Sequence, residues 1–300
     1  MSALCYNRRE VIRVKYRLST ECGSAARLVG EERAIEYIAR AGFDAFDLTM
    51  LEMAKYDKKR GIAIDTGHPL ASGEYLSFVR RLRRVARDSG IVCNQTHAPH
   101  PTSAPNIRDS LMRAIECTAE IGASICIIHP QNNATVEENA QMFSSILPFA
   151  REYNVTVACE NMWNWNAEED HARPAACSTP ESFVKHLDAV GDERLVACLD
   201  IGHAEMYGLG TSAPEMIEAL GERLAALHVH DNDRHRDKHQ IPFSMDIDLC
   251  AVAEALGRVG YSGYITLEAN RFLDAYTPDN ALEGLKKMYA AAQRFAKMIK

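Results

Sequence analysis

The sequence alternates short apolar or β-branched runs with longer amphipathic segments, and this alternation constrains the fold more than any other feature. We predict eight strands, each followed by a helix, at residues 12–18, 43–50, 91–97, 124–129, 155–160, 195–200, 224–230 and 264–268. Strands separated by helices pair in parallel and are buried on both faces. Eight such units, without a flexible linker, predict an α/β fold: one (β/α)8 TIM barrel spanning residues 1–300 as a single domain. A doubly wound open sheet is the alternative, but no glycine-rich phosphate loop follows the first strand.

The helical segments show the expected period of apolar residues. The helix predicted at 74–88 carries a basic run, Arg80 to Arg84, which we interpret as a solvated face. The helix predicted at 136–153 contains Pro148, which should kink or break it. Ser178, Thr179 and Pro180 indicate the start of a further helix after a long polar loop.

Charge and cysteine content limit the partners and the compartment. The net charge of −7 and the pI near 5.9 argue against a surface that binds a polyanion, so no nucleic-acid partner is expected. The first ten residues lack an apolar signal region and no run reaches transmembrane length, so we expect no membrane partner. Nine scattered cysteines, several inside apolar strands, indicate a reducing cytoplasm and no disulfide framework.

Six consecutive predicted strands finish on metal-capable side chains. In a barrel of this kind the chemistry lies at the carboxyl ends of the strands. Each residue alone is more often a hydrogen-bonded loop residue, but six coincidences in a row indicate a common site. The strand-end residues and those just beyond them are His97, His129, Glu160, Asp200, His203, His228, His230, Asp237, His239 and Glu268. The densest stretch, LHVHDNDRHRDKH at residues 227–239, indicates the edge of a metal site.

These residues lie in motifs that resemble a known family. The strings THAP, IIHP, ACEN, CLDIGHA, LHVHDND, DKH and TLEAN resemble the xylose isomerase-like TIM barrel superfamily, the sugar phosphate isomerase/epimerase group related to endonuclease IV. The resemblance covers essentially the whole chain. It implies one divalent ion, as in the epimerases, held by Glu160, Asp200, His228 and Glu268. The H-x-x-D spacing to Asp231 favours His228 over His230, although both would point the same way on a strand.

The endonuclease IV-like members of the group imply a different metal content. They hold further ions at positions that correspond here to His97, His129, His203, Asp237 and His239.

Two departures from the family pattern bear on the substrate. The segment from Ile241 to Met245 replaces a glycine-rich turn, and Asn166 stands where epimerases of free ketoses carry a second glutamate.

The ligand chemistry agrees with an isomerase. Carboxylates with an imidazole suit Mn²⁺, Mg²⁺, Co²⁺ or Zn²⁺ and leave coordination positions for substrate oxygens. We therefore predict a metal-dependent isomerase or epimerase of a sugar, sugar phosphate or related polyol in carbohydrate metabolism. Glu160 and Glu268 would transfer the proton through a metal-stabilised enediolate. The resemblance also implies a homodimer.

Three other functions remain open. One is an endonuclease IV-like zinc phosphodiesterase with more than one zinc ion, and another is an enolate-forming lyase or dehydratase. The third is an accessory barrel that needs a partner chain. Other side chains have more than one interpretation. His203 contacts a substrate hydroxyl or a second metal, or only makes a hydrogen bond at the start of a helix, and His230 contacts substrate or a second metal. Trp163 and Trp165 form a substrate wall or cover the rim. Asp47, near the end of the second strand, binds a hydroxyl group or is structural.

Overall fold

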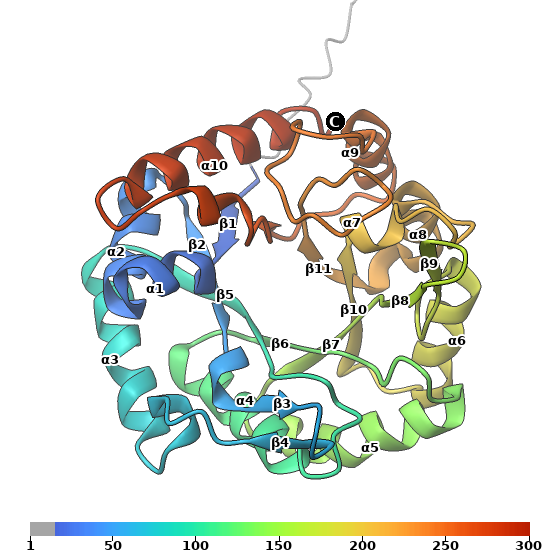
Figure 1. Cartoon of the computed structure of the whole chain (residues 1–300), viewed down its shortest axis with the longest axis horizontal. Helices are drawn as coiled ribbons and strands as arrows, with labels where there is room; N and C mark the ends of the chain where they lie inside the picture. Colours follow the sequence, from blue (N-terminus) through green and yellow to red (C-terminus); the bar gives the residue numbers. More distant parts are fainter. Residues whose placement is uncertain (1–15) are drawn as a thin grey trace, which may run out of the picture.

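The computed structural model describes residues 16–300. Eight parallel strands lie at the centre of the molecule, and helices surround them in a ring (Figure 1). The strands are β1 (Leu18–Glu21), β2 (Ala45–Thr49), β5 (Val92–His97), β6 (Ile125–Ile128), β7 (Thr156–Glu160), β10 (Leu195–Asp200), β11 (Leu224–His228) and β12 (Ile265–Leu267). The outer helices are α2 (Glu31–Ala41), α3 (Tyr75–Asp88), α4 (Arg108–Ile121), α5 (Val136–Glu152), α6 (Pro180–Val190), α8 (Ala213–Leu220), α9 (Leu249–Arg258) and α10 (Ala281–Ala296).

The strands form a closed ring. They are hydrogen-bonded in the order β11-β10-β7-β6-β5-β2-β1-β12, and all of these pairs are parallel. The two ends of this order meet where Val229 pairs in parallel with Leu267, and Val229 N donates to Thr266 O at 2.8 Å. The predicted (β/α)8 barrel is therefore confirmed and the open sheet is wrong. Because every strand runs the same way, all carboxyl ends lie at one end of the barrel.

The strand boundaries differ from the prediction in two informative places. The first strand begins at Leu18, where the prediction ended, and residues 12–15 lie outside the described part of the chain. This strand is fully buried although it carries polar side chains, and Ser19 Oγ donates to Asn94 Oδ1 at 2.6 Å. A hydropathy pattern does not register such a buried polar layer. The seventh strand, β11, ends at His228 and not at residue 230.

The helices cover the barrel with one apolar face each. In α3, Phe78, Val79, Leu82 and Ala86 are buried and the arginines from Arg80 to Arg84 are exposed, as predicted. Of the kink or break predicted at Pro148, the break is wrong, because α5 runs unbroken from Val136 to Glu152. Its N-terminus has a capping box, and residues on both sides of Pro148 pack into the core.

Shorter elements complete the fold: the helices α1 (Gly23–Val29) and α7 (Ile201–Ala204), the hairpins β3–β4 (Lys55–Asp57, Ile62–Ile64) and β8–β9 (Trp163–Asn166, His171–Pro174), and single 3-10 turns at Leu51–Met53, Pro69–Ala71, Gly221–Arg223 and Phe272–Ala275. The hairpin β8–β9 replaces the predicted polar loop after β7. Among residues 16–300, no helix is both long and apolar enough to cross a membrane. The eight cysteines in this part of the chain are free thiols.

Candidate metal centre

Four acidic or imidazole side chains converge at the carboxyl end of the barrel. Glu160 ends β7, Asp200 ends β10, His228 ends β11, and Glu268 follows β12. One ligand atom from each lies within 4.8 Å of the other three. Metal–ligand distances are about 2.0–2.6 Å, so one divalent ion can contact all four side chains. We call these four residues the inner group.

A buried carboxylate fixes the orientation of His228. The Nδ1 atom of His228 lies 3.1 Å from Glu160 Oε1 and 3.6 Å from Glu268 Oε2. Its Nε2 atom lies 3.2 Å from Asp47 Oδ2, and both residues are fully buried. Gln95 Nε2 donates to the same Asp47 oxygen at 2.9 Å. With Nε2–H donating to Asp47, the lone pair of Nδ1 faces the inner group, as in the carboxylate–histidine pairs that support bound metals.

Asp200 has one oxygen held and one free. It caps the N-terminus of α7, where its Oδ1 accepts from His203 N at 2.7 Å. Asn161 ties this strand end to β7, because its Nδ2 donates to Asp200 O and its Oδ1 accepts from Asp200 N. The Asp200 Oδ2 atom is buried with no hydrogen-bond partner among the described residues. A buried carboxylate oxygen without a partner is costly, so this position fits a cation.

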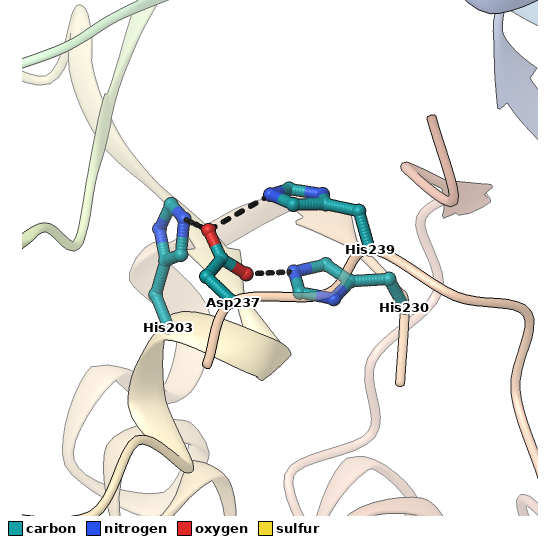
Figure 2. Close-up of side chains that lie close together, drawn as sticks. All are labelled: His203, His230, Asp237 and His239. Carbon is teal, nitrogen blue, oxygen red and sulfur yellow. Dashed lines mark hydrogen bonds and ion pairs between the residues drawn. The ribbon is translucent and has the colours of Figure 1, made fainter. Parts of the chain in front are cut away.

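A second cluster, the outer group, comprises His203, His230, Asp237 and His239, whose ligand atoms also lie within 4.8 Å of one another. Figure 2 shows the three rings directed at the Asp237 carboxylate. Asp237 Oδ2 lies 2.9 Å from His239 Nε2 and 3.3 Å from His203 Nε2. Asp237 Oδ1 lies 3.6 Å from His230 Nε2.

Backbone carbonyls set the tautomers in the outer group. His203 Nδ1 lies 2.9 Å from Asn161 O, and His239 Nδ1 lies 2.8 Å from Glu268 O. A carbonyl only accepts, so each Nδ1 carries the hydrogen and the neutral ring directs its Nε2 lone pair at Asp237. A lone pair facing a carboxylate oxygen requires a proton or a cation between them. This donor set fits Zn²⁺ or another divalent transition metal.

A third cluster, the linking group, comprises His97, His129 and Glu160. His97 Nδ1 lies 2.9 Å from Ala98 O, so its Nε2 lone pair faces His129 Nε2 at 3.0 Å. Glu160 Oε2 lies 3.1 Å from His129 Nε2, whereas Glu160 Oε1 lies 3.1 Å from His228 Nδ1. Glu160 therefore belongs to the inner and the linking groups through different oxygens.

A glycine permits the close packing of the outer group. A Cβ atom on Gly202, in α7, would lie 1.9 Å from His230 Cε1. The His230 ring therefore rests against the backbone of α7, stacked on the His239 ring with centroids 3.9 Å apart. Its Nε2 atom lies 3.0 Å from Asp200 Oδ1, which places the inner and outer groups in contact.

In these clusters, buried carboxylates lie next to imidazoles, and each kind of group shifts the pKa of the other. Burial alone would raise the pKa of Glu160, but His228 and His129 outweigh it and hold that pKa well below its usual value. Burial likewise favours neutral His239, yet the charge of Asp237 and the hydrogen bond to it raise the His239 pKa to about 9. Burial raises the pKa of Glu268. A bound cation would replace the protons on these imidazoles, so metal binding and proton release are coupled.

The two tryptophans lie at the edge of the outer group. They point to one face of β8 and pack against Ala172, Met206 and Leu209. The Trp163 ring centroid is 6.4 Å from that of His203, and the Arg236 guanidinium lies 3.8 Å from the centroid of Trp165. Rim packing therefore accounts for part of their burial, and contact with a substrate stays a prediction.

The structure brings every predicted strand-end side chain into one of the three clusters. It assigns His228 to the inner group and His230 to the outer group. The sequence pattern did not predict the hydrogen bonds by which Asp47 and Asn161 support His228 and Asp200. The residue after a strand-end ligand, such as Asn161 in ACEN, is the signal that could have suggested one of them.

The chain is a closed (β/α)8 barrel with imidazoles and carboxylates clustered at its carboxyl end. Residues 35–291 match the model of the xylose isomerase-like TIM barrel family, and the chain belongs to this family. It is 24% identical over 293 residues to the uncharacterized protein y4fM of Sinorhizobium fredii, with 90% of each chain covered. It is 27% identical over 171 residues to the uncharacterized protein MJ1311 of Methanocaldococcus jannaschii, covering 54% of this chain and 56% of that protein.

Solved structures show the same fold at low identity. A D-tagatose 3-epimerase-like protein superposes with a TM-score of 0.67 and 19% identity, covering 95% of this chain and all of that chain. The 3-keto-D-glucoside 4-epimerase YcjR from E. coli superposes with a TM-score of 0.65 and 13% identity, covering 92% of this chain and all of that chain. The IolI protein with a bound zinc atom superposes with a TM-score of 0.65 and 16% identity, covering 93% of this chain and 99% of that chain. At these identities the likeness concerns the fold.

Proposed function

We propose that this protein is a divalent-metal-dependent enzyme that isomerises or epimerises a sugar or a related polyol. The observation that carries the proposal is the inner group, in which Asp47 orients His228 toward Glu160 and Glu268. Structural neighbours that are named as epimerases support this class of reaction, and one with a bound zinc atom supports a metal site. The mixed oxygen and nitrogen ligands suit Mn²⁺, Mg²⁺, Co²⁺ or Zn²⁺.

A divalent ion at the inner group would polarise a hydroxy-ketone and stabilise its enediolate. Glu160 and Glu268 come from different sides of the barrel, separated in the ring by β10 and β11. One carboxylate can therefore remove a proton from a bound carbon while the other returns a proton to the opposite face. Asp47 and Asn161 keep His228 and Asp200 oriented, so the chain positions its ligands before a substrate arrives.

Metal content and solvent exchange test this proposal together. The purified protein is analysed for bound metals and then incubated in D₂O with a panel of ketoses. We expect at least one divalent ion per chain and deuterium incorporation at one substrate carbon, both lost after chelation and restored by metal. Exchange that persists in the metal-free protein, or its absence with every ketose at full metal content, would contradict the proposal.

One observation favours a zinc phosphodiesterase as the second candidate. Glu160 directs one oxygen to His228 and the other to His129, and a carboxylate shared in this way is suited to bridging two metal ions. The outer group would hold a third ion. The net charge of −7 disfavours a polyanionic substrate. Three zinc ions per chain with cleavage of a phosphodiester would favour this candidate, whereas exchange at carbon followed by loss of water would indicate a dehydratase.

A further inference from the structure

A cavity of about 520 Å³ lies beside the metal centre, between the loops that follow β5, β6 and β7. Its wall includes His129, which contacts Glu160 Oε2 at 3.1 Å, but neither Glu160 nor Glu268 lines it. The cavity is therefore additional space next to the metal centre, and its volume is typical of small-molecule sites. We call it the amide pocket because its walls carry Gln131, Asn132, Asn133 and Asn164.

Hydrogen bonds hold these amides in place. Asn164 Nδ2 donates to Asn133 Oδ1 at 2.9 Å, and Asn132 Nδ2 donates to Trp163 O at 3.1 Å. Gln131 Nε2 donates to Thr102 O at 3.3 Å. An amide side chain has two donor hydrogens and an acceptor oxygen with two lone pairs, so each retains hydrogen-bonding capacity. Fixed groups that both donate and accept match the hydroxyl groups of a carbohydrate.

The charge of the pocket opposes an anionic ligand. No lysine or arginine of the described residues lines it, and its ionisable side chains are two histidines and Glu138. The N-terminus of α5 opens here, and a free helix N-terminus would attract phosphate. However, Thr135 and Glu138 form a capping box, and Glu137 adds a second negative charge in the first turn. This helix end is already neutralised and repels an anion.

Two arginines of the loop after β11 already form ion pairs. Arg236 Nη2 lies 2.6 Å from Asp170 Oδ1, and Arg234 Nη2 lies 3.5 Å from Glu205 Oε2. A phosphate in the amide pocket would therefore lack the arginine or lysine partners that phosphate sites in proteins use.

Two features suit an uncharged sugar unit. Thr102 lines the pocket with 4% of its surface exposed, and its hydroxyl has no hydrogen-bond partner among the described residues. The rings of His100 and His129 are stacked, with centroids 4.8 Å apart and planes inclined by 16°. The wall of the pocket thus includes a residue whose buried hydroxyl has no partner, and two stacked imidazole rings next to the candidate metal centre.

We propose that the amide pocket binds an uncharged, hydroxyl-bearing unit of the substrate beyond the carbons that react. The substrate is then an unphosphorylated glycoside and not a sugar phosphate. This inference rests on the proposed function and names its substrate class. In the complex, substrate hydroxyl groups hydrogen-bond to the fixed amides, and one of them partners Thr102.

Calorimetric titration of the metal-loaded protein tests the inference. The probes are neutral disaccharides that differ in linkage and ring stereochemistry, their component monosaccharides, and the corresponding hexose phosphates. We expect at least one disaccharide to bind about tenfold or more tightly than its monosaccharides and than every phosphate, a difference of about 1.4 kcal/mol. Tighter binding of a phosphate, or no gain for any disaccharide, would overturn the inference.

Two variants test whether the gain in disaccharide affinity comes from the amide pocket. Asn133→Asp keeps the acceptor for Asn164 but replaces the amide donor with a charged oxygen, and Thr102→Val removes the hydroxyl that has no partner. Each should weaken disaccharide binding about threefold to tenfold, the effect of one hydrogen bond, and leave monosaccharide binding unchanged. Thr102→Val should fold with undiminished stability.

The matched control is Asn154→Asp, exposed at the opposite end of the barrel. Wild-type disaccharide affinity in both pocket variants would show that the unit binds elsewhere.

The outcome separates this inference from the proposed function, because binding is measured without turnover. A disaccharide gain that depends on the pocket, in a protein that exchanges no substrate proton, would leave the inference standing and remove the isomerase. Proton exchange with a sugar phosphate and with none of the neutral sugars would support the isomerase and overturn this inference.

Discussion

The inner and outer groups lie in contact but are built on different supports. Three of the four inner residues end a barrel strand, so strand pairing fixes their positions. In the outer group, Asp237 and His239 come from the loop after β11, and His239 has a φ of 42°, in the left-handed region. That loop is held by Asp231, which accepts hydrogen bonds from Met245 N at 2.8 Å and Ile247 N at 3.1 Å.

This difference indicates how the two groups should respond to change. Strand pairing fixes three of the inner residues, and a change there removes a candidate ligand or its buried support. The outer group depends on the course of one loop and on the packing of His230 against Gly202. We therefore expect variants of the two groups to have separable effects on metal content and on activity.

The largest effect is expected at Glu160, which the inner and linking groups share. Glu160→Gln removes a charged ligand from both groups and the proposed proton-transfer group. Deuterium exchange into substrate should fall by about 10²–10⁴-fold, with fewer bound ions per chain. The control is Glu168→Gln in the exposed turn of the β8–β9 hairpin. Unchanged exchange and metal content in Glu160→Gln would refute the role of the inner group.

Asp47 tests the support beneath the inner group. Asp47→Asn removes the charge that holds the His228 ring, so the affinity of the inner ion should fall about 10–100-fold. Metal titration of the dialysed protein measures this directly. Ser19→Ala is the control, because it removes a hydrogen bond from the same buried polar layer without contacting His228. It should lower the free energy of unfolding by about 1 kcal/mol and leave metal affinity unchanged.

His239 tests whether the two groups act independently. His239→Ala should remove the ion of the outer group, while the inner group keeps its ion. Exchange should then fall by less than about tenfold, or about 1.4 kcal/mol in activation free energy. Metal counting and deuterium exchange on the same preparation give the result. A loss of activity as complete as in Glu160→Gln would mean that the groups act as one unit and would favour the phosphodiesterase.

Gly202 tests the packing of the outer group, with the smallest effect. Gly202→Ala places a Cβ against the His230 ring, so the free energy of unfolding should fall by about 1–3 kcal/mol. The outer ion should bind more weakly and exchange at the inner group should persist. Gly73→Ala is the control, since no atom lies within 4 Å of its added Cβ. Equal stability of the two variants in denaturant titrations would show that the close contact at Gly202 has no consequence.

The same contrast explains what the sequence could predict. The alternation of apolar runs predicted the barrel, and strand ends such as Asp200 followed from it directly, because strand periodicity determines where a buried run stops. Strand periodicity alone does not separate His228 from His230, since both face the same way on an ideal strand but β11 ends at His228. The choice of His228 came from the family resemblance and its H-x-x-D spacing to Asp231. The contact between Asp47 and His228 joins strands far apart in the chain, so no local pattern indicates it.

The most direct test is to locate the metal itself. Crystals of the protein soaked in Mn²⁺ and measured near the manganese absorption edge would show each ion by anomalous scattering. We expect a peak within coordination distance, about 2.0–2.6 Å, of oxygens of Glu160, Asp200 and Glu268 and of His228 Nδ1. Peaks confined to exposed carboxylates, with the inner group empty at full soaking, would contradict it.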